Sequence, residues 1–174
     1  MDSQKSLLKK IAYNYGLMLA GVSIMVLAVM YALGLDKSWT ISIISIIATI
    51  LIFVYGILAF KKGNSNEISL IQALKVGLAI AVIGGVLSAI YAYIHYSYIY
   101  PEFVEMTQQN ALDDALAKNP EIEGEALELT EKMINIFTSP FVMATFSLIG
   151  SLFFGFIISI ITGAIIKNNK PKGN

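Results

Sequence analysis

The stretch Phe141–Ile166 reads FVMATFSLIGSLFFGFIISIITGAII and contains no charged residue. It is longer than the about 20 apolar residues that a helix needs to cross a bilayer. Three more apolar runs precede it, at Ile11–Leu35, Trp39–Phe60 and Val76–Tyr100. Of the 174 residues, 56% are hydrophobic and 14% are charged, which is typical of membrane proteins rather than soluble domains. The sequence therefore predicts an all-α integral membrane protein.

The four runs predict a four-helix bundle in the membrane. We expect one membrane domain over residues 1–174, with spans at about 11–35, 39–60, 70–100 and 140–166 and a helical insertion at 101–139. Gly34 suits the C′ position that ends a helix, and Ser38 suits the N-cap of the next helix. The first two spans should therefore form a helical hairpin.

The charged residues between the runs are sorted by sign. Both chain ends and the segment Lys61–Lys75 hold nine of the twelve lysines, whereas residues 101–139 hold nine acids against two lysines, a net charge of −7. Lysines in short loops set the orientation of membrane proteins and face the cytoplasm. We therefore expect a bacterial inner (cytoplasmic) membrane protein with both termini cytoplasmic. The turn at Asp36 and the acidic insertion should lie outside.

Prolines mark the helices expected in the acidic insertion. Tyr100-Pro101 should end the third span and begin a helix that continues to about Lys118. Asn119-Pro120 and Ser139-Pro140 each read as an N-cap followed by proline at the first helical position, so they predict a second helix from Pro120 and the fourth span from Pro140. We predict a small acidic extracytoplasmic helical hairpin; a disordered acidic loop is the alternative. Periodic apolar residues favour the hairpin: Phe103, Met106, Leu112, Ala115, Leu116, Leu127, Thr130, Ile134 and Phe137.

Small residues recur at every fourth position of two spans. Such residues let helix backbones approach closely in lipid. We interpret them as helix-packing residues within one chain, with a dimer seam and a pore as alternatives, and we expect Ile80 on a lipid-facing side. The third span carries Ala73, Gly77, Ala81, Gly85 and Ala89, extended by Gly84, Ser88 and Ala92; the fourth carries Ser147, Ser151, Gly155, Ser159 and Gly163; the first has a weaker series, Ala12, Gly16, Ala20, Ala28 and Ala32.

Aromatic residues crowd the end of the third span. An α-helical period places Tyr91, His95 and Tyr98 on one face, and Tyr93, Tyr96 and Tyr100 on another. We interpret the cluster as an interfacial aromatic girdle. A cation or ligand site, or a pH sensor, is the alternative.

Three glutamates of the insertion, Glu121, Glu125 and Glu128, would share one face of a helix that begins at Pro120. Together with Tyr91, His95 and Tyr98 they are candidate outer-face contacts. We interpret them as a solvated acidic face, with divalent-cation binding as the alternative, because the segment lacks an EF-hand pattern.

No constellation for catalysis is visible. The chain has no Cys and no Arg, and no Asp or Glu lies within a span. Phosphate loops, zinc patterns and Ser/His/Asp groupings are missing, so we assign no catalytic, cofactor-binding or metal residue. Nucleic-acid binding would need a far larger basic patch. Coupled transporters usually place ionisable residues at mid-depth, which disfavours that class.

Two segments resemble an uncharacterised bacterial membrane family, the domain of unknown function 4199. The first runs from Glu67 to Gly77 and contains the pattern Ser-x-x-Gln-Ala-x-Lys-x-Gly. The second runs from Tyr91 to Phe103, where a tyrosine-rich helix end leads into Pro-x-Phe. The resemblance extends over nearly the whole length and implies four spans with a long loop between the last two. It implies no activity and no catalytic residue.

The function expected from these features is a non-enzymatic structural or accessory membrane subunit, in contact with the lipid bilayer and with either its own copies as a homo-oligomer or another membrane protein. The alternative is a small transporter or channel component. A water-filled cavity between the third and fourth spans would favour transport, and a tight, dry seam would favour the accessory role. An intramembrane enzyme ranks last because no reactive grouping exists.

Overall fold

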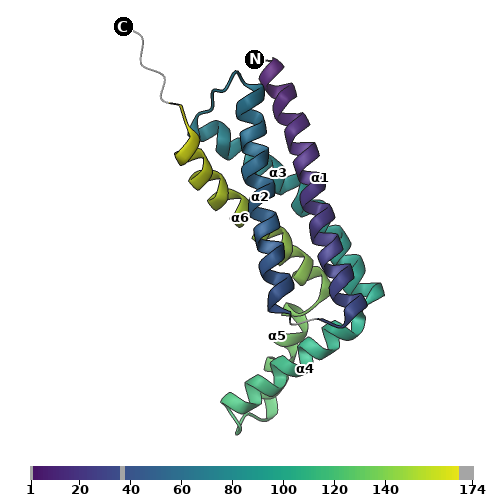
Figure 1. Cartoon of the computed structure of the whole chain (residues 1–174). Coiled ribbons are helices and arrows are strands. Elements are labelled where there is room, and N and C mark those ends of the chain that lie inside the picture. The colour runs from purple at the N-terminus through teal and green to yellow at the C-terminus, as the bar shows by residue number, and fades with distance from the viewer. Residues whose placement is uncertain (1, 36–37, 169–174) are drawn as a thin grey trace. The chain divides into compact units, whose positions relative to one another are not determined.

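The computed structural model describes residues 2–35 and 38–168, which form helices and no strand. The predicted all-α class is confirmed. The predicted turn residue Asp36 and the last two lysines lie outside the described residues. The elements, shown in Figure 1, are α1 (Asp2–Leu33), α2 (Trp39–Gly63), α3 (Leu70–Ile94), the π-helix η1 (His95–Ile99), α4 (Pro101–Lys118), α5 (Gly124–Phe137) and α6 (Pro140–Ile166).

Four of these helices are long and apolar enough to cross a membrane, judged by length and composition: Ser3–Leu33, Trp39–Gly63, Leu70–Ile99 and Pro140–Ile166. The first begins well before the predicted start at residue 11. The residues that precede Ile11 include Gln4, Leu7 and several lysines, which are good helix formers, so the helix continues beyond the apolar run.

The chain forms two compact units. The first contains Met1–Ser88 and Leu148–Asn174, and the second contains Ala89–Ser147. The first unit therefore holds α1, α2, most of α3 and most of α6. The second holds the end of α3, η1, α4, α5 and the start of α6.

Gly34 occupies the C′ position that ends α1, as predicted, and the structure adds that the end is a Schellman motif. Gly34 adopts a φ of +61°. Its N–H donates to the carbonyl oxygen of Tyr31 (3.2 Å), and the N–H of Leu35 donates to that of Met30 (2.9 Å). The predicted N-cap of α2 is also confirmed, because the Ser38 hydroxyl accepts a hydrogen bond from the N–H of Ile41 (3.4 Å). Helices α1 and α2 pack against each other (Figure 1).

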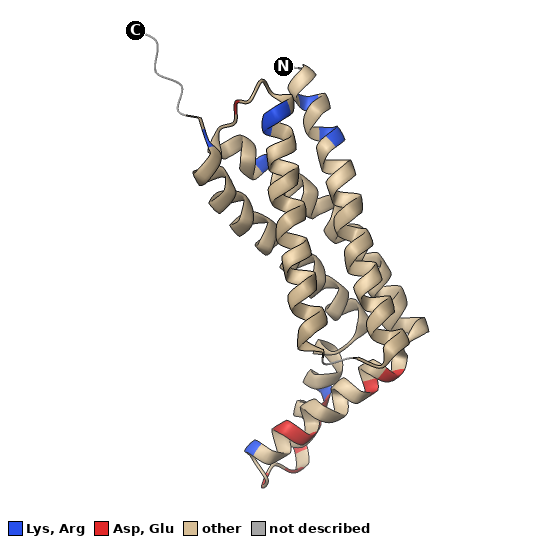
Figure 2. Ribbon diagram, in the orientation of Figure 1, with Lys and Arg blue, Asp and Glu red and all other residues tan. Residues whose placement is uncertain are grey.

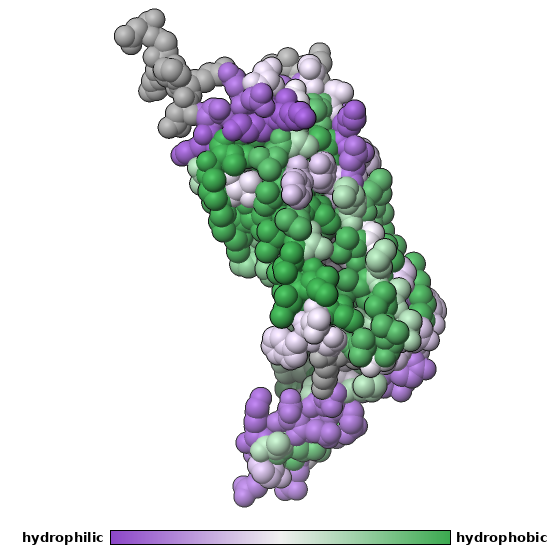
Figure 3. Space-filling view, viewed as in Figure 1, coloured by the Kyte–Doolittle hydropathy of each residue, from purple (hydrophilic) through white to green (hydrophobic). Residues whose placement is uncertain are grey.

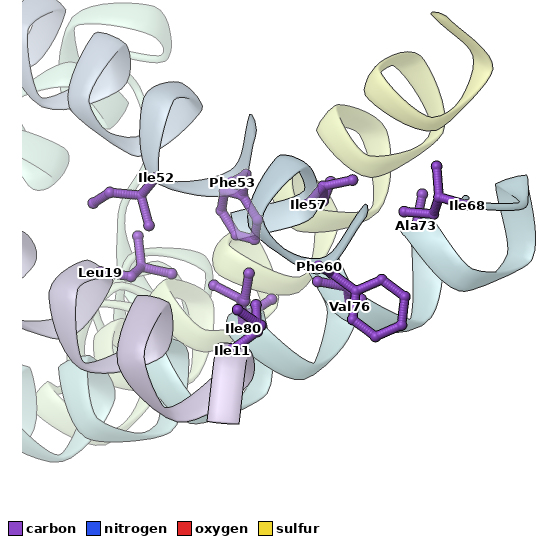
Figure 4. Packing of buried hydrophobic residues seen from close by; sticks show 11 residues of the cluster. Ile11, Leu19, Ile52, Phe53, Ile57, Phe60, Ile68, Ala73, Val76 and Ile80 are labelled. Carbon is purple, nitrogen blue, oxygen red and sulfur yellow. The ribbon is translucent and has the colours of Figure 1, made fainter. Parts of the chain in front are cut away.

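The core of the first unit lies where α1, α2 and α3 meet (Figure 4). Phe53, Ile57 and Phe60 of α2 contribute its largest side chains, and Val76 and Ile80 of α3 lie among them. The expected lipid-facing position of Ile80 is wrong, since its side chain is 0% exposed. A Cβ added to Gly56 would lie 2.6 Å from Ile80 Cδ1, so Ile80 fills the space that this glycine leaves on α2.

The lysines of the first unit that the structure describes gather at one end (Figure 2). That end joins the start of α1, the end of α2 and the end of α6. Gln4 Nε2 donates to Asn64 Oδ1 (2.9 Å), and Lys61 Nζ donates to the Ile166 carbonyl oxygen (2.8 Å). Beyond this end, most of the surface on the face shown in Figure 3 is apolar, and many large apolar side chains of the unit are exposed.

Helix α4 has the predicted bounds, whereas α5 begins later than predicted. Asn119 and Pro120 enter a turn, in which the N–H of Ile122 donates to the Asn119 carbonyl oxygen (3.1 Å). Proline is as well suited to position i+1 of a turn as to the first position of a helix, and here the turn prevails. The helix starts only after Glu123, which is extended at φ −150°. Helix α6 begins at Pro140, as predicted.

Replacing Gly34 by Ala should destabilise the chain by about 1 kcal/mol, because an L residue is strained at positive φ. Nothing lies within 4 Å of a Cβ at Gly34, so the effect would come from the backbone alone. Gly21→Ala on the same helix is the control, since its Cβ would also meet open space and its φ is helical. Thermal melts in mild detergent should show a lower midpoint for Gly34→Ala only. Equal midpoints would contradict the strain.

Candidate functional site

A close helix contact in the first unit joins α3 and α6 through their small residues. A Cβ at Gly155 would lie 2.7 Å from Ala81 Cβ, and a Cβ at Gly77 would lie 2.7 Å from Ser159 Cβ. Real Cβ atoms essentially never approach so closely, so the two backbones touch only because these residues are glycines. Of the predicted helix-packing residues, the structure brings these four together within one chain.

This contact between α3 and α6, called the α3–α6 seam below, continues in both directions along the helices. Towards the end of α6, a Cβ at Gly163 would lie 2.7 Å from Ala73 Cβ. Towards the start of α6, a Cβ at Gly85 would lie 3.0 Å from Ser151 Cβ. Two further predicted packing residues of these spans, Ala89 and Ser147, belong to the second unit. Ala89 is half-buried and Ser147 is exposed.

Two hydroxyl groups in the seam find backbone acceptors. Ser159 is fully buried, and its hydroxyl donates to the carbonyl oxygen of Gly155 one turn earlier. Ser151 donates across the seam to the carbonyl oxygen of Ala81 (3.3 Å). Serine thus keeps the side chain small without leaving its hydroxyl unpaired in an apolar environment.

A second small face of α3 contacts α1. A Cβ at Gly84 would lie 2.9 Å from the carbonyl oxygen of Gly16, and a Cβ at Gly16 would lie 2.8 Å from Ile83 Cβ. Leu19 of α1 also lies against Gly84, with its Cβ 2.8 Å from a Cβ added there. Helix α3 is therefore held closely by two neighbours, and Ala73, Val76 and Ala81 are all fully buried.

The pattern that carries the family resemblance occupies the start of α3. Ser69 and Gln72 form a capping box: the N–H of Gln72 donates to Ser69 Oγ (3.2 Å), and the N–H of Ser69 donates to Gln72 Oε1 (2.8 Å). Ala73 and Gly77 then contact α6. Lys75 lines a polar cavity of about 580 Å³ beside them. The pattern thus caps α3 and seats it against α6.

The polar cavity is a feature that the sequence analysis missed. Its lining combines side chains from the start of α1, the loop after α2, the start of α3 and the residues after α6: Gln4, Asn64, Glu67, Ser69, Gln72, Lys75 and Asn168. Asn168 bridges the ends, since its N–H donates to the Ile68 carbonyl oxygen (3.0 Å) and its Oδ1 accepts from the Ile68 N–H (3.3 Å). The sequence signal that could have indicated this cavity is the number of Asn and Gln residues around the lysine-rich loop.

The aromatic cluster of the second unit centres on His95, whose side chain is only 2% exposed. Its ring lies 5.6 Å from that of Tyr91, 5.3 Å from that of Tyr96 and 6.3 Å from that of Tyr100, measured between centroids. Tyr96 in turn stacks on Phe103 at 5.2 Å. The cluster therefore includes the Tyr and Pro-x-Phe residues of the second resembling segment.

The predicted faces of this cluster hold only in part, because the helix changes its period. Tyr91 packs beside His95 as predicted, whereas Tyr98 is exposed. Over His95–Ile99 the chain is a π-helix, and the N–H of Tyr100 donates to the carbonyl oxygen of His95 (2.7 Å). This i→i+5 pairing places Tyr100 rather than Tyr98 beside the histidine. Tyr98, expected on the His95 face, is 74% exposed.

The predicted acidic face is not assembled. Glu121 lies in the turn before α5, so it does not share a helical face with Glu125 and Glu128, and all three are exposed.

A cavity of about 300 Å³ between α4 and α5 is lined instead by Glu105, Gln108, Gln109, Leu112, Glu131, Ile134 and Asn135. The sequence signal that could have indicated this cavity is the helical spacing of Glu105, Gln108 and Gln109. Among the described residues, no three Asp, Glu or His side chains are grouped to hold a metal.

Helix α5 exposes an apolar stripe. The predicted inner residues of α5 are partly buried at Leu127, Thr130 and Ile134. Phe137, the last residue of α5, was predicted on the same inner face, but this is wrong because its side chain is 55% exposed. On α4, Phe103, Leu112, Ala115 and Leu116 are partly buried, whereas Met106 is exposed. The exposed stripe of α5 consists of Leu129, Met133, Ile136 and Phe137, at helical spacing.

A family model described as "Protein of unknown function (DUF4199)" matches residues 14–168 of the chain. The match includes all of α2–α6 and most of α1, together with both resembling segments, so the predicted resemblance is confirmed. No curated protein and no solved structure matches the chain.

Gly155→Ala should lower the stability of the chain by about 1–3 kcal/mol, because the added methyl group overpacks the seam against Ala81 and Phe53. Gly150→Ala, on the same helix, is the matched control, since nothing lies within 4 Å of its Cβ. Thermal melts in detergent should separate the two variants. A Gly155→Ala midpoint no lower than that of Gly150→Ala would refute the close contact.

Proposed function

We propose that this chain, which belongs to the DUF4199 family of proteins of unknown function, is a non-enzymatic structural or accessory subunit of the bacterial inner membrane. In this proposal α1, α2, α3 and α6 form an integral four-helix bundle. Helices α4 and α5 form an acidic hairpin outside, and both termini are cytoplasmic. The partners are lipid and either further copies of the chain or another membrane protein.

The membrane location is supported by the surface of the four long helices. Large apolar side chains such as Leu17, Met25, Ile44, Phe146 and Ile165 remain more than half exposed after folding. Continuous apolar surface of this kind is unfavourable in water but is the expected surface of a helix in lipid. The orientation is supported by the lysines at the starts of α1 and α3 and the ends of α2 and α6.

The α3–α6 seam is the observation that carries the accessory role. At Gly77 and Gly155 the seam has no room for one additional carbon atom, so it cannot hold a hydrated path at these positions. Its hydroxyls donate to backbone carbonyls rather than line a passage. A rigid, closely packed helix pair suits a subunit that acts through its surface, and the α5 stripe supplies exposed apolar surface for such contacts.

Cysteine labelling tests the orientation. In the chain, which has no native cysteine, Ser3→Cys and Glu123→Cys each place one thiol at an exposed position. A membrane-impermeant maleimide applied to intact spheroplasts should label residue 123 and spare residue 3. Both should react once the membranes are permeabilised. The reverse pattern would invert the topology, and recovery of the chain in the soluble fraction would exclude the membrane location.

Affinity purification and flux measurements distinguish the accessory role from transport. The full chain, extracted in mild detergent, should retain itself or another membrane protein in fixed stoichiometry. The double variant Met133→Gln/Ile136→Gln should reduce this retention at least about tenfold, whereas Glu128→Gln/Lys132→Gln, on the same helix, should not. Proteoliposomes of the purified chain should pass ions and small solutes no faster than empty liposomes. Selective flux, with no retained partner, would support the transporter or channel alternative instead.

A further inference from the structure

An apolar groove runs between α2 and α6 in the first unit. Its volume is about 320 Å³, and it is lined by Ile50 and Val54 of α2 and by Ile158, Ile161 and Ile165 of α6. Ile161 and Ile165 are more than half exposed, so the groove opens to the surface of the unit. Thr162, which also lines it, is buried. The groove therefore offers a hydrocarbon surface with almost no polar group.

The groove ends at a cationic group. Ile166 forms its last wall, and Lys61 Nζ donates to the carbonyl oxygen of this residue at 2.8 Å. A lysine ammonium has three donors, of which this hydrogen bond uses one. Lys62 and Lys167 follow directly on the two helices, and both are exposed. The apolar groove is thus continuous with a site that attracts anions.

The groove and the lysines beyond its end together span a length close to one leaflet of a bilayer. From Ile158 to Ile166 helix α6 rises about 12 Å, and from Ile50 to Lys61 helix α2 rises about 16 Å. Half of the hydrocarbon core is about 15 Å. A chain that lies along the groove with its head at the lysines would therefore reach close to the middle of the membrane.

We infer that the α2–α6 groove binds an anionic glycerophospholipid, with one acyl chain along Val54 and Ile158 and the phosphate beside Lys61, Lys62 and Lys167. The dimensions favour an acyl chain over a helix of another protein, because a helix is about 10–12 Å wide with its side chains and needs a broader surface. The inference rests on the membrane location in the proposed function, but not on the accessory role.

Native mass spectrometry of the purified full chain tests the site. Phosphatidylglycerol should bind at least about tenfold more tightly than phosphatidylcholine with the same acyl chains, since each lysine near an anionic group contributes about a factor of five. Lys62→Gln/Lys167→Gln should remove this preference. Lys9→Gln/Lys10→Gln, which changes the net charge equally on α1, should keep it. A preference unchanged by the first pair would overturn the headgroup site.

Groove-filling variants test the acyl chain. Ile161→Trp fills the groove from the α6 wall, and Val54→Phe narrows the groove from the α2 wall. Each variant should weaken the binding of both lipids at least about fivefold. Ile44→Phe, exposed on α2, should have no effect. Full binding by correctly folded groove variants would overturn the inference, as would displacement of phosphatidylglycerol by inorganic phosphate. If the groove variants lost a dimer but kept the lipid, the groove would be assigned to the binding of a second copy of the chain. Recovery of wild type in the soluble fraction would instead refute the membrane location itself.

Discussion

The close approach of α3 and α6 is the constraint on which the rest of the first unit depends. In the proposed membrane location, lipid is as apolar as a leucine side chain, so no hydrophobic effect would drive the two helices together and packing contacts would hold them. At Gly77 and Gly155 the contact includes backbone atoms, and a single added carbon would overlap the opposite helix. The serines of the seam keep this distance while satisfying their own hydroxyls.

The polar end of the first unit sets the register of this seam. The capping box of Ser69 and Gln72 starts α3, and Asn168 ties the residue before that box to the end of α6. Lys61 then supplies a donor for the Ile166 carbonyl oxygen, one of the helix-end acceptors that no residue of α6 can satisfy. The residues that carry the family resemblance thus cap α3, line the polar cavity beside it and contact α6. In this region the family pattern holds the start of α3 and its contact with α6 in place.

The second unit shows how one local change of helical period redistributes side chains. An α-helix would have carried Tyr98 onto the face of His95. The π-helical turn advances each pairing by one residue, so that Tyr100 and the stacked Tyr96–Phe103 pair surround the histidine instead. The break at Pro101 then starts α4 directly after the cluster. A buried histidine packed by aromatic rings follows from this geometry.

The sequence by itself determined the helix content, the four long apolar helices, the helix-ending position of Gly34 and the starts of α2, α4 and α6, because each depends on local signals such as chain polarity, caps and prolines. It also identified the small residues that later meet in the α3–α6 seam. Only the tertiary structure decided that Ile80 is buried beneath Gly56, that Pro120 enters a turn, that Tyr100 rather than Tyr98 faces His95, and that Glu105 and Glu131 share a cavity. The period of a helix fixes which residues share a face, but only its neighbours decide whether that face is buried and whether the period is kept.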